Sequence, residues 1–264
     1  MAGTPRMTSD NTTVLIIGSG PNAIRATAWP REKFTHIVVI NNAWRIRPDW
    51  DACIFPDDFP DDRQPPAVLP GQSLIRSDQY VPIQNDFGGF VYAGGTMAFT
   101  AGYWALAALR PSVMAFVGCD MVYPARGNTH FYGIGAADPL RRDITLQSLE
   151  AKSARLALLA AEQGCACVNL LGETSRLLFP RASVANVADA SPDMPDDAAF
   201  AAARTAEADL GYMVPSGRYW EQADRFDPAA LRAIDDLWLT AYAASSSSSA
   251  SAPAATRALR RAGG

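Results

Sequence analysis

Small and polar residues directly follow the first strongly apolar run of the chain, and this segment is the best candidate for ligand binding. It reads VLIIGSGPNA over residues 14–23, which is the order of a strand, a glycine turn and a helix start. Glycine lets backbone N–H groups approach a phosphate, and a helix N-terminus adds a positive dipole. We therefore expect a nucleotide or phosphate at the turn made by Gly18, Ser19, Gly20, Pro21 and Asn22. Turns of this kind also join elements that bind nothing, and that alternative stays open.

Turns with similar residues follow other apolar segments or precede a long helix. They are Asn41-Asn42, Pro56-Asp57-Asp58, Gly94-Gly95-Thr96 and Gly118-Cys119-Asp120. In doubly wound sheets, ligands bind beyond the carboxyl ends of the strands. We therefore expect one shared site along this edge, although turns are rich in such residues for structural reasons too.

The side chains at these turns suit a nucleotide. The carboxamide of Asn41 can both donate to and accept from a base or sugar, and Asp57 can accept from a ribose hydroxyl or a base amine. Asp120 can do the same or hold its own loop in an Asx-turn. Tyr123 can donate to a phosphate or lie on the core.

Two histidines are present, and only one lies where it could act in catalysis. His36 begins an apolar strand and is interpreted as structural. His130 lies in GNTHFYGIG, a loop rich in glycine and aromatic residues, where it could be a general base near neutral pH. A solvent-exposed loop histidine is the alternative.

The cysteines do not indicate a metal or redox site. Cys165 and Cys167 are spaced C-x-C with no histidine nearby, and Cys53, Cys119 and Cys167 fall in apolar runs. We expect buried, reduced thiols.

Strand and helix patterns alternate through residue 170. Strands are expected at 13–17, 36–40, 51–55, 73–76, 113–117 and 166–170, and helices before Trp29-Pro30, at 96–109 and at 144–163. This order predicts an α/β fold, a Rossmann-like, largely parallel sheet flanked by helices. The expected organisation is a flexible lead (1–12), a nucleotide-binding domain (13–182), a helical appendage (183–243) starting a helix at Asp227-Pro228, and a disordered Ser/Ala-rich tail (244–264).

Composition excludes several classes of partner. The formal net charge of −4 and pI near 5.2 give no electrostatic footprint for nucleic acid. No run approaches the ~18 apolar residues that a membrane span needs. The polar N-terminus has no apolar signal core, so a cytoplasmic location is expected. The oligomeric state cannot be predicted from these features.

A dinucleotide enzyme is one alternative, since GSGPNA fits G-x-G-x-x-A. Two features count against it. Strand two ends in Asn41, where an acidic residue would normally hold the ribose, and the chain is short for a flavin domain plus a pyridine-nucleotide domain.

Residues 13–180 resemble the bacterial sialyltransferase family that uses CMP-sugars, related transferases of Kdo-type sugars, and proteins similar to archaeal hydroxymethylpterin diphosphokinases. GSGPN matches the family's G-x-G-P-S with Asn22 in place of serine, and INNAW matches its strand-two C-N-Q-F element. CIFPD matches a strand end where the family has asparagine and this chain has Asp57. ALAALRPSVMAFVGCD resembles its helix, strand and G-x-D turn, and ETSRLLFP a late serine-leucine segment.

The resemblance implies a CMP-sugar donor, a glycan acceptor, inversion at the anomeric carbon and no essential metal or other cofactor. It places the turn at 18–22 against the phosphate and Asn41 and Asp57 against the cytidine. It also places Gly95-Thr96 near the ribose or base and Tyr123 at the phosphate. The family's base histidine precedes the helix before the last core strand, where an ungapped alignment puts Gln147. His130 can serve only if the loop at 124–142 folds back over the site.

Three functions follow from these observations. The first is a CMP-sugar-dependent glycosyltransferase with His130 as base. The second is a nucleotide-dependent phosphotransferase like the pterin kinases. Its only candidate magnesium ligands are the carboxylates of Asp57, Asp58, Asp61 and Asp62. This cluster is better explained as a solvated acidic loop. The third is a non-catalytic nucleotide-sugar-binding accessory protein.

Overall fold

A sheet of six parallel strands forms the centre of the protein, in the order β4-β3-β2-β1-β5-β6. The structure is a computed structural model that describes residues 12–136, 138–172 and 174–251. The strands are β1 (Thr13–Ile17), β2 (His36–Ile40), β3 (Ala52–Ile54), β4 (Ser73–Ile75), β5 (Val113–Val117) and β6 (Ala166–Asn169). The α/β, Rossmann-like fold expected from the sequence is confirmed, with three strands shorter by a terminal residue or two.

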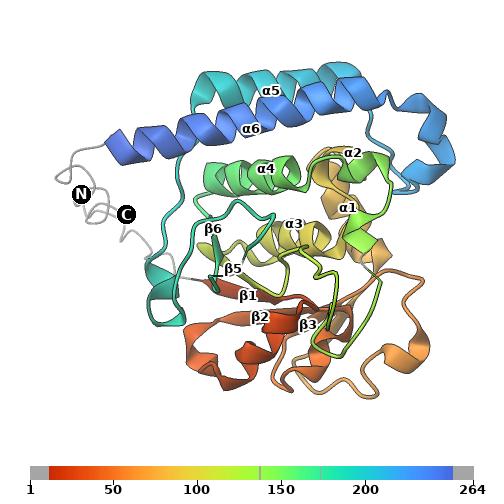
Figure 1. The fold of residues 1–264 in the computed structure, drawn as a ribbon, viewed down its shortest axis with the longest axis vertical. Coiled ribbons are helices and arrows are strands. Elements are labelled where there is room, and N and C mark those ends of the chain that lie inside the picture. Colours follow the sequence, from red (N-terminus) through yellow and green to blue (C-terminus); the bar gives the residue numbers. More distant parts are fainter. Residues whose placement is uncertain (1–11, 137, 173, 252–264) are drawn as a thin grey trace, which may run out of the picture.

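Helices cover one face of the sheet in two successive layers. They are α1 (Ser77–Asp86), α2 (Phe90–Ala93), α3 (Met97–Leu109), α4 (Leu149–Glu162), α5 (Asp197–Leu210) and α6 (Pro228–Ser251). Figure 1 shows α3 and α4 above the sheet, with α5 and α6 side by side beyond α4. Alternate residues of β1 divide between two apolar clusters, Val14 and Ile16 facing the α3 side and Leu15 and Ile17 the other. Burial on both faces explains why the strands read as continuous apolar runs.

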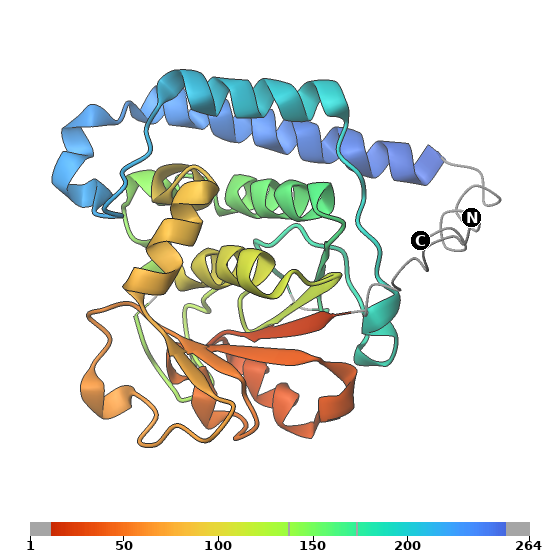
Figure 2. The same ribbon diagram turned by 180° about the vertical axis from the view of Figure 1, so that it is seen from behind.

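Short 3-10 helices cover the opposite face. They are η1 (Pro21–Ala28), η3 (Asn41–Arg45) and η7 (Val184–Asp189), and Figure 2 shows the first two beneath the sheet, away from α3. The helix expected after strand one is therefore present as η1. Trp29 ends it with extended backbone (φ −83°, ψ 136°), because a residue that precedes a proline disfavours helical geometry.

The helix expected over residues 144–163 is divided in two. Residues 144–146 form the 3-10 helix η6 (Ile144–Leu146), and α4 begins only at Leu149. The reason is a second cap: Asp143 accepts from the Thr145 amide at 2.8 Å, and Ser148 accepts from the Ala151 amide at 3.1 Å. Helices α1 and α2 were not expected.

Helix α6 begins as expected and ends later than expected. The Asp227 carboxylate accepts from the Ala229 amide at 2.8 Å, which caps the helix at Asp227-Pro228. The helix then continues to Ser251, into the segment predicted to be disordered from residue 244. The predicted flexible lead and the rest of the predicted tail fall on residues 1–11 and 252–264, outside the described residues.

Buried ion pairs join α4 to the outer helix layer. The Arg155 guanidinium donates to Glu207 at 2.7 Å, to Tyr103 Oη at 2.8 Å and lies 5.4 Å from the Trp238 ring centroid. Lys152 Nζ lies 2.7 Å from Asp235 Oδ1. These pairs fix how α5 and α6 sit on α4.

All four cysteines are free and buried, as the sequence predicted. None of the helices in residues 12–136, 138–172 and 174–251 combines the length and apolar composition needed to cross a bilayer.

Candidate active site

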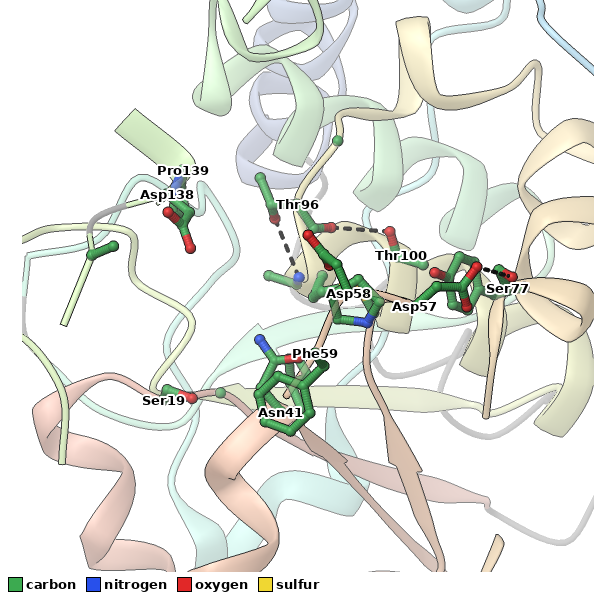
Figure 3. A pocket seen from close by; sticks show the side chains of 18 of the residues that line it. Ser19, Asn41, Asp57, Asp58, Phe59, Ser77, Thr96, Thr100, Asp138 and Pro139 are labelled. Carbon is green, nitrogen blue, oxygen red and sulfur yellow. Dashed lines mark hydrogen bonds between the residues drawn. The ribbon is translucent and has the colours of Figure 1, made fainter. Parts of the chain in front are cut away.

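A cleft of about 1860 Å³ opens along the carboxyl edge of the sheet, where the sequence placed the shared site. Its lining includes these candidate residues: Gly18, Ser19, Asn41, Asp57, Gly95, Thr96, Tyr123 and His130. Figure 3 shows Asp57 and Asp58 on one side, Asp138 and Pro139 on the other, Thr96 above, and Ser19 and Asn41 below. The strand-end residues therefore converge as parallel-sheet topology requires.

The glycine turn after β1 packs against the turn after β5. The Gly18 amide donates to the Val117 carbonyl and the Gly20 amide to the Gly118 carbonyl, both at 2.8 Å. A Cβ added at Gly18 would lie 2.3 Å from the Gly118 oxygen, so only glycine permits this approach. Pro21 has no N–H, and these glycine amides already have partners. The glycines are thus explained by packing, and the turn offers a phosphate few free donors.

Gly20, Pro21, Asn22 and Asp120 do not line the cleft. Asn22 Nδ2 donates to Asp120 Oδ2 at 2.8 Å, which ties the turn after β1 to the turn after β5. The Asp120 carbonyl also accepts from the Arg176 amide at 3.0 Å. Asn22 Nδ2 and Asp120 Oδ2 thus bond to each other, whereas Asn22 Oδ1 is buried without a partner among the described residues. The assignment of these four residues to ligand binding stays a prediction.

Two asparagines that directly follow β2, Asn41 and Asn42, lie in the cleft wall. Asn41 lines the cleft in left-handed backbone (φ 52°), a conformation that asparagine tolerates better than most residues. Asn42 also lines the cleft and is 5% exposed. The Oδ1 atoms of both are buried without a hydrogen-bond partner. An unpartnered buried amide is costly, so this wall is suited to a ligand with polar groups.

The part of the wall that follows β3 is acidic. Asp57 Oδ2 accepts a hydrogen bond at 2.6 Å from the hydroxyl of Ser77, which is the first residue of α1. Asp58 is exposed beside it and also lines the cleft. Figure 3 shows the Asp57 side chain turned toward Ser77. Asp57 is thus held by α1, a helix that sequence analysis missed.

Helix α3 begins at the cleft. Thr96 caps it, since its hydroxyl accepts from the Ala98 amide at 3.2 Å. The Gly95 amide donates to Thr145 Oγ1 at 3.0 Å, and a Cβ at Gly95 would lie 2.8 Å from that oxygen. Thr96, Met97 and Ala98 line the cleft, so the positive end of the helix dipole faces it.

Residues 124–136 fold back over the sheet edge and bring His130 into the cleft. The Phe131 amide donates to the Ser19 carbonyl at 3.0 Å, which ties the loop to the turn after β1. His130 is 8% exposed, lines the cleft and stacks on Tyr132 with ring centroids 5.0 Å apart. The solvent-exposed alternative for His130 is therefore wrong.

The cleft holds His130 and Tyr123 in their neutral forms. Burial lowers the pKa of His130, and the Asp138 carboxylate opposes this more weakly. Burial also raises the pKa of Tyr123 to about 12, so its hydroxyl remains a donor. The Tyr123 ring centroid lies 5.8 Å from that of His130.

A polar network that was not predicted from the sequence lies on the wall beside α3. Asp143 accepts from Tyr219 Oη at 2.7 Å and pairs with Arg141 Nη2 at 2.9 Å. Arg141 also donates to the Gly95 carbonyl at 3.0 Å. Tyr219 comes from η8 (Tyr219–Arg225), in the C-terminal segment expected to contribute to acceptor specificity, where no individual residue was predicted. No pattern in the sequence marks a tyrosine this far along the chain.

No cluster of three or more His, Cys, Asp and Glu side chains in the described segments is arranged to hold a metal ion. Comparisons with models of known protein families, with curated proteins and with solved structures find no match.

Proposed function

We propose that this protein is a CMP-sugar-dependent glycosyltransferase in which His130 is the general base. The observation that carries the proposal is the folded-back loop, which puts a buried histidine of lowered pKa in the cleft at the sheet edge. A neutral imidazole near physiological pH is suited to take a proton from an acceptor hydroxyl. The motif resemblance of residues 13–180 supports the choice of donor.

Arg45 and Arg63 are the side chains we assign to the donor phosphate. The other arginines of the cleft are already paired, Arg141 with Asp143 and Arg218 with Glu221 at 3.5 Å. In the part of the chain that the structure describes, neither Arg45 nor Arg63 pairs with a carboxylate, and both line the cleft. Guanidinium groups bind phosphate through several N–H donors.

Trp44 brings these two arginines to the same part of the rim. The Arg45 guanidinium lies 5.1 Å from the centroid of the Trp44 ring, and Trp44 Nε1 donates to the Arg63 carbonyl at 2.9 Å. The neighbouring amides of Asn41 and Asn42 would then meet the polar groups of the cytidine.

The proposed reaction is an inverting displacement. His130 Nε2 removes the proton of an acceptor hydroxyl while the hydroxyl oxygen forms a bond to the anomeric carbon. The bond from that carbon to the phosphate oxygen breaks, and CMP leaves with the bonding electron pair. Burial keeps His130 neutral before the reaction, and the nearby Asp138 carboxylate stabilises the imidazolium that forms.

Release of CMP from CMP-activated sialic acid and Kdo tests this proposal. We expect the wild-type chain to release CMP in the presence of a glycan acceptor, and His130→Gln to lower that rate by about 10²–10⁴-fold, the usual contribution of a general base. CMP binding should be kept in His130→Gln. An unchanged rate would exclude His130 as base, and tight CMP binding with no turnover would favour the accessory-protein alternative.

A magnesium-nucleotide phosphotransferase is the second candidate, because acidic side chains outnumber basic ones in the cleft. Asp57, Asp58, Asp62, Asp78, Asp138, Asp143 and Glu221 line it against Arg45, Arg63, Arg141 and Arg218. Carboxylates without basic partners suit a hydrated magnesium ion carried by a nucleotide. A thermal-shift comparison separates the two candidates: ATP with magnesium should stabilise a phosphotransferase, whereas CMP without metal should stabilise a CMP-sugar enzyme.

A further inference from the structure

Hydrogen bonds beside His130 occupy the proton and both acceptor sites of the Thr129 hydroxyl. Thr129 Oγ1 accepts from the Gly135 amide at 2.8 Å and lies 3.2 Å from the Gly135 carbonyl, to which it donates. The same oxygen lies 2.9 Å from His130 Nδ1. A hydroxyl has one proton and two acceptor sites. If the proton goes to the Gly135 carbonyl, the contact with Nδ1 can only be a bond donated by the imidazole.

The opposite arrangement satisfies fewer groups. If Thr129 donated its proton to Nδ1, the Gly135 carbonyl would lose the one donor that the described residues give it. Thr129 Oγ1 would then keep an empty acceptor site beside the ring. The arrangement with the proton on Nδ1 is therefore favoured, and it leaves Nε2 as the nitrogen with a free lone pair.

The backbone around His130 fixes the ring in this contact. The His130 amide donates to the Gly133 carbonyl at 2.9 Å, and the Gly133 amide donates back at 3.1 Å. A Cβ added at Gly135 would lie 2.7 Å from His130 Nδ1 and 2.9 Å from Cε1, so glycine lets the loop close against this edge of the ring. Tyr132 stacks on one face. Nε2 has no hydrogen-bond partner among the described residues, and His130 lines the cleft.

We propose that Thr129 is a positioning residue that holds His130 in the tautomer with the proton on Nδ1, so that the Nε2 lone pair serves the cleft. This inference rests on the proposed function for its purpose, because a general base must present an unprotonated nitrogen to its substrate. Thr129 acts only through His130. Its own hydroxyl is committed to the ring and to Gly135.

Nuclear magnetic resonance of the ¹⁵N-labelled full chain tests the tautomer directly. The chain has two histidines, so His130→Gln leaves the signals of His36 alone and assigns those of His130. Above the pKa of His130, two-bond ¹H–¹⁵N correlations should show a protonated Nδ1 and an unprotonated Nε2. Thr129→Ser keeps the hydroxyl and should keep this pattern. Thr129→Val keeps the shape without the hydroxyl and should shift the population toward the Nε2–H tautomer.

Gly135→Ala supplies a second perturbation that leaves Thr129 intact. Its Cβ should displace the ring from Thr129 and give the same shift as Thr129→Val, while unchanged His36 signals show that the chain is folded. A wild-type His130 with the proton on Nε2 would overturn the inference. So would a Thr129→Val spectrum identical to the wild type.

The readout requires no ligand, so it is independent of the proposed function. Absence of CMP binding together with an Nδ1–H tautomer would reject the glycosyltransferase and leave the inference standing. CMP turnover together with an Nε2–H tautomer would support the glycosyltransferase and overturn the role inferred for Thr129.

Discussion

His130 links the electrostatics of the cleft to a measurable pH dependence. Burial lowers its pKa, and a general base acts only in its neutral form. The kcat/KM for the sugar donor should therefore rise with pH along a limb whose midpoint lies below about 6.5, the ordinary value for histidine. The pH–rate profile measures this, and a midpoint at or above the ordinary value would count against a buried base.

Asp138 should set part of that midpoint. Its carboxylate favours the imidazolium and so raises the pKa of His130 against the larger effect of burial. Asp138→Asn removes that charge, and the acidic limb should move to lower pH. Asp209→Asn, on the exposed side of α5, is the matched control and should leave the profile unchanged. Movement of the limb to higher pH would contradict the assigned sign.

The same histidine should make stability depend on pH. Its pKa is lower in the folded chain than in the unfolded chain, so the unfolded chain binds more protons between the two values. The free energy of unfolding should consequently fall as the pH drops below about 6.5. This loss should be smaller in His130→Gln. Urea denaturation at a series of pH values measures the difference, and equal slopes in both proteins would refute it.

At the scale of elements, the close contact between the turns after β1 and β5 is the feature most sensitive to substitution. Gly18→Ala would place a Cβ 2.3 Å from the Gly118 oxygen and 2.7 Å from Cys119 Sγ. Overpacking of this kind costs about 1–3 kcal/mol of unfolding free energy. Apart from its chain neighbours, Gly172→Ala meets no atom of the described residues within 4 Å and should change the free energy by less than about 0.5 kcal/mol. Chemical denaturation of both variants measures these free energies of unfolding. A Gly18→Ala variant as stable as Gly172→Ala would disprove the close approach of the two turns.

The central elements could be predicted from the sequence because strands buried on both faces read as continuous aliphatic runs. Residues 13–17, 36–40 and 113–117 show this pattern, and the structure has strands at those positions. Helix α1 could not be predicted in the same way, since Pro82 lies inside it and removes a backbone donor. The short α2 lies between Gly89 and Gly94, residues that normally indicate a turn.

Some candidate site residues could be predicted from the sequence and others could not. Asn41, Asp57 and Thr96 could be found because parallel topology brings strand ends and helix starts to one edge. The packing role of Gly18 and Gly20 could not be predicted, because it depends on Gly118, about a hundred residues further along the chain. Tyr219 escaped prediction because it reaches the cleft only through the packing of α5 and α6 on α4.

For the whole molecule, the buried ion pairs hold the outer helices and hence Tyr219 in place. Glu207→Gln leaves the Arg155 guanidinium buried without its carboxylate partner, and we expect a loss of about 3–5 kcal/mol of unfolding free energy. Arg204→Ala removes an ion pair with Glu162 whose side chains are about half exposed, which should cost about 0–1 kcal/mol. Equal effects in urea denaturation would show that burial of the Arg155 pair contributes nothing.

Calorimetric titration of CMP into the purified chain, without added metal, measures whether the cleft binds the nucleotide of the proposed donor. We expect saturable heat with CMP, and weaker binding in an Arg45→Ala, Arg63→Ala double variant because both guanidinium groups are assigned to the phosphate. Ile24→Ala, an exposed substitution outside the cleft, should give the same heat as the wild type. No heat with CMP or a CMP-sugar at millimolar concentration would contradict CMP-sugar binding in the cleft. Binding that the double variant leaves unchanged would contradict the assignment of Arg45 and Arg63 to the phosphate.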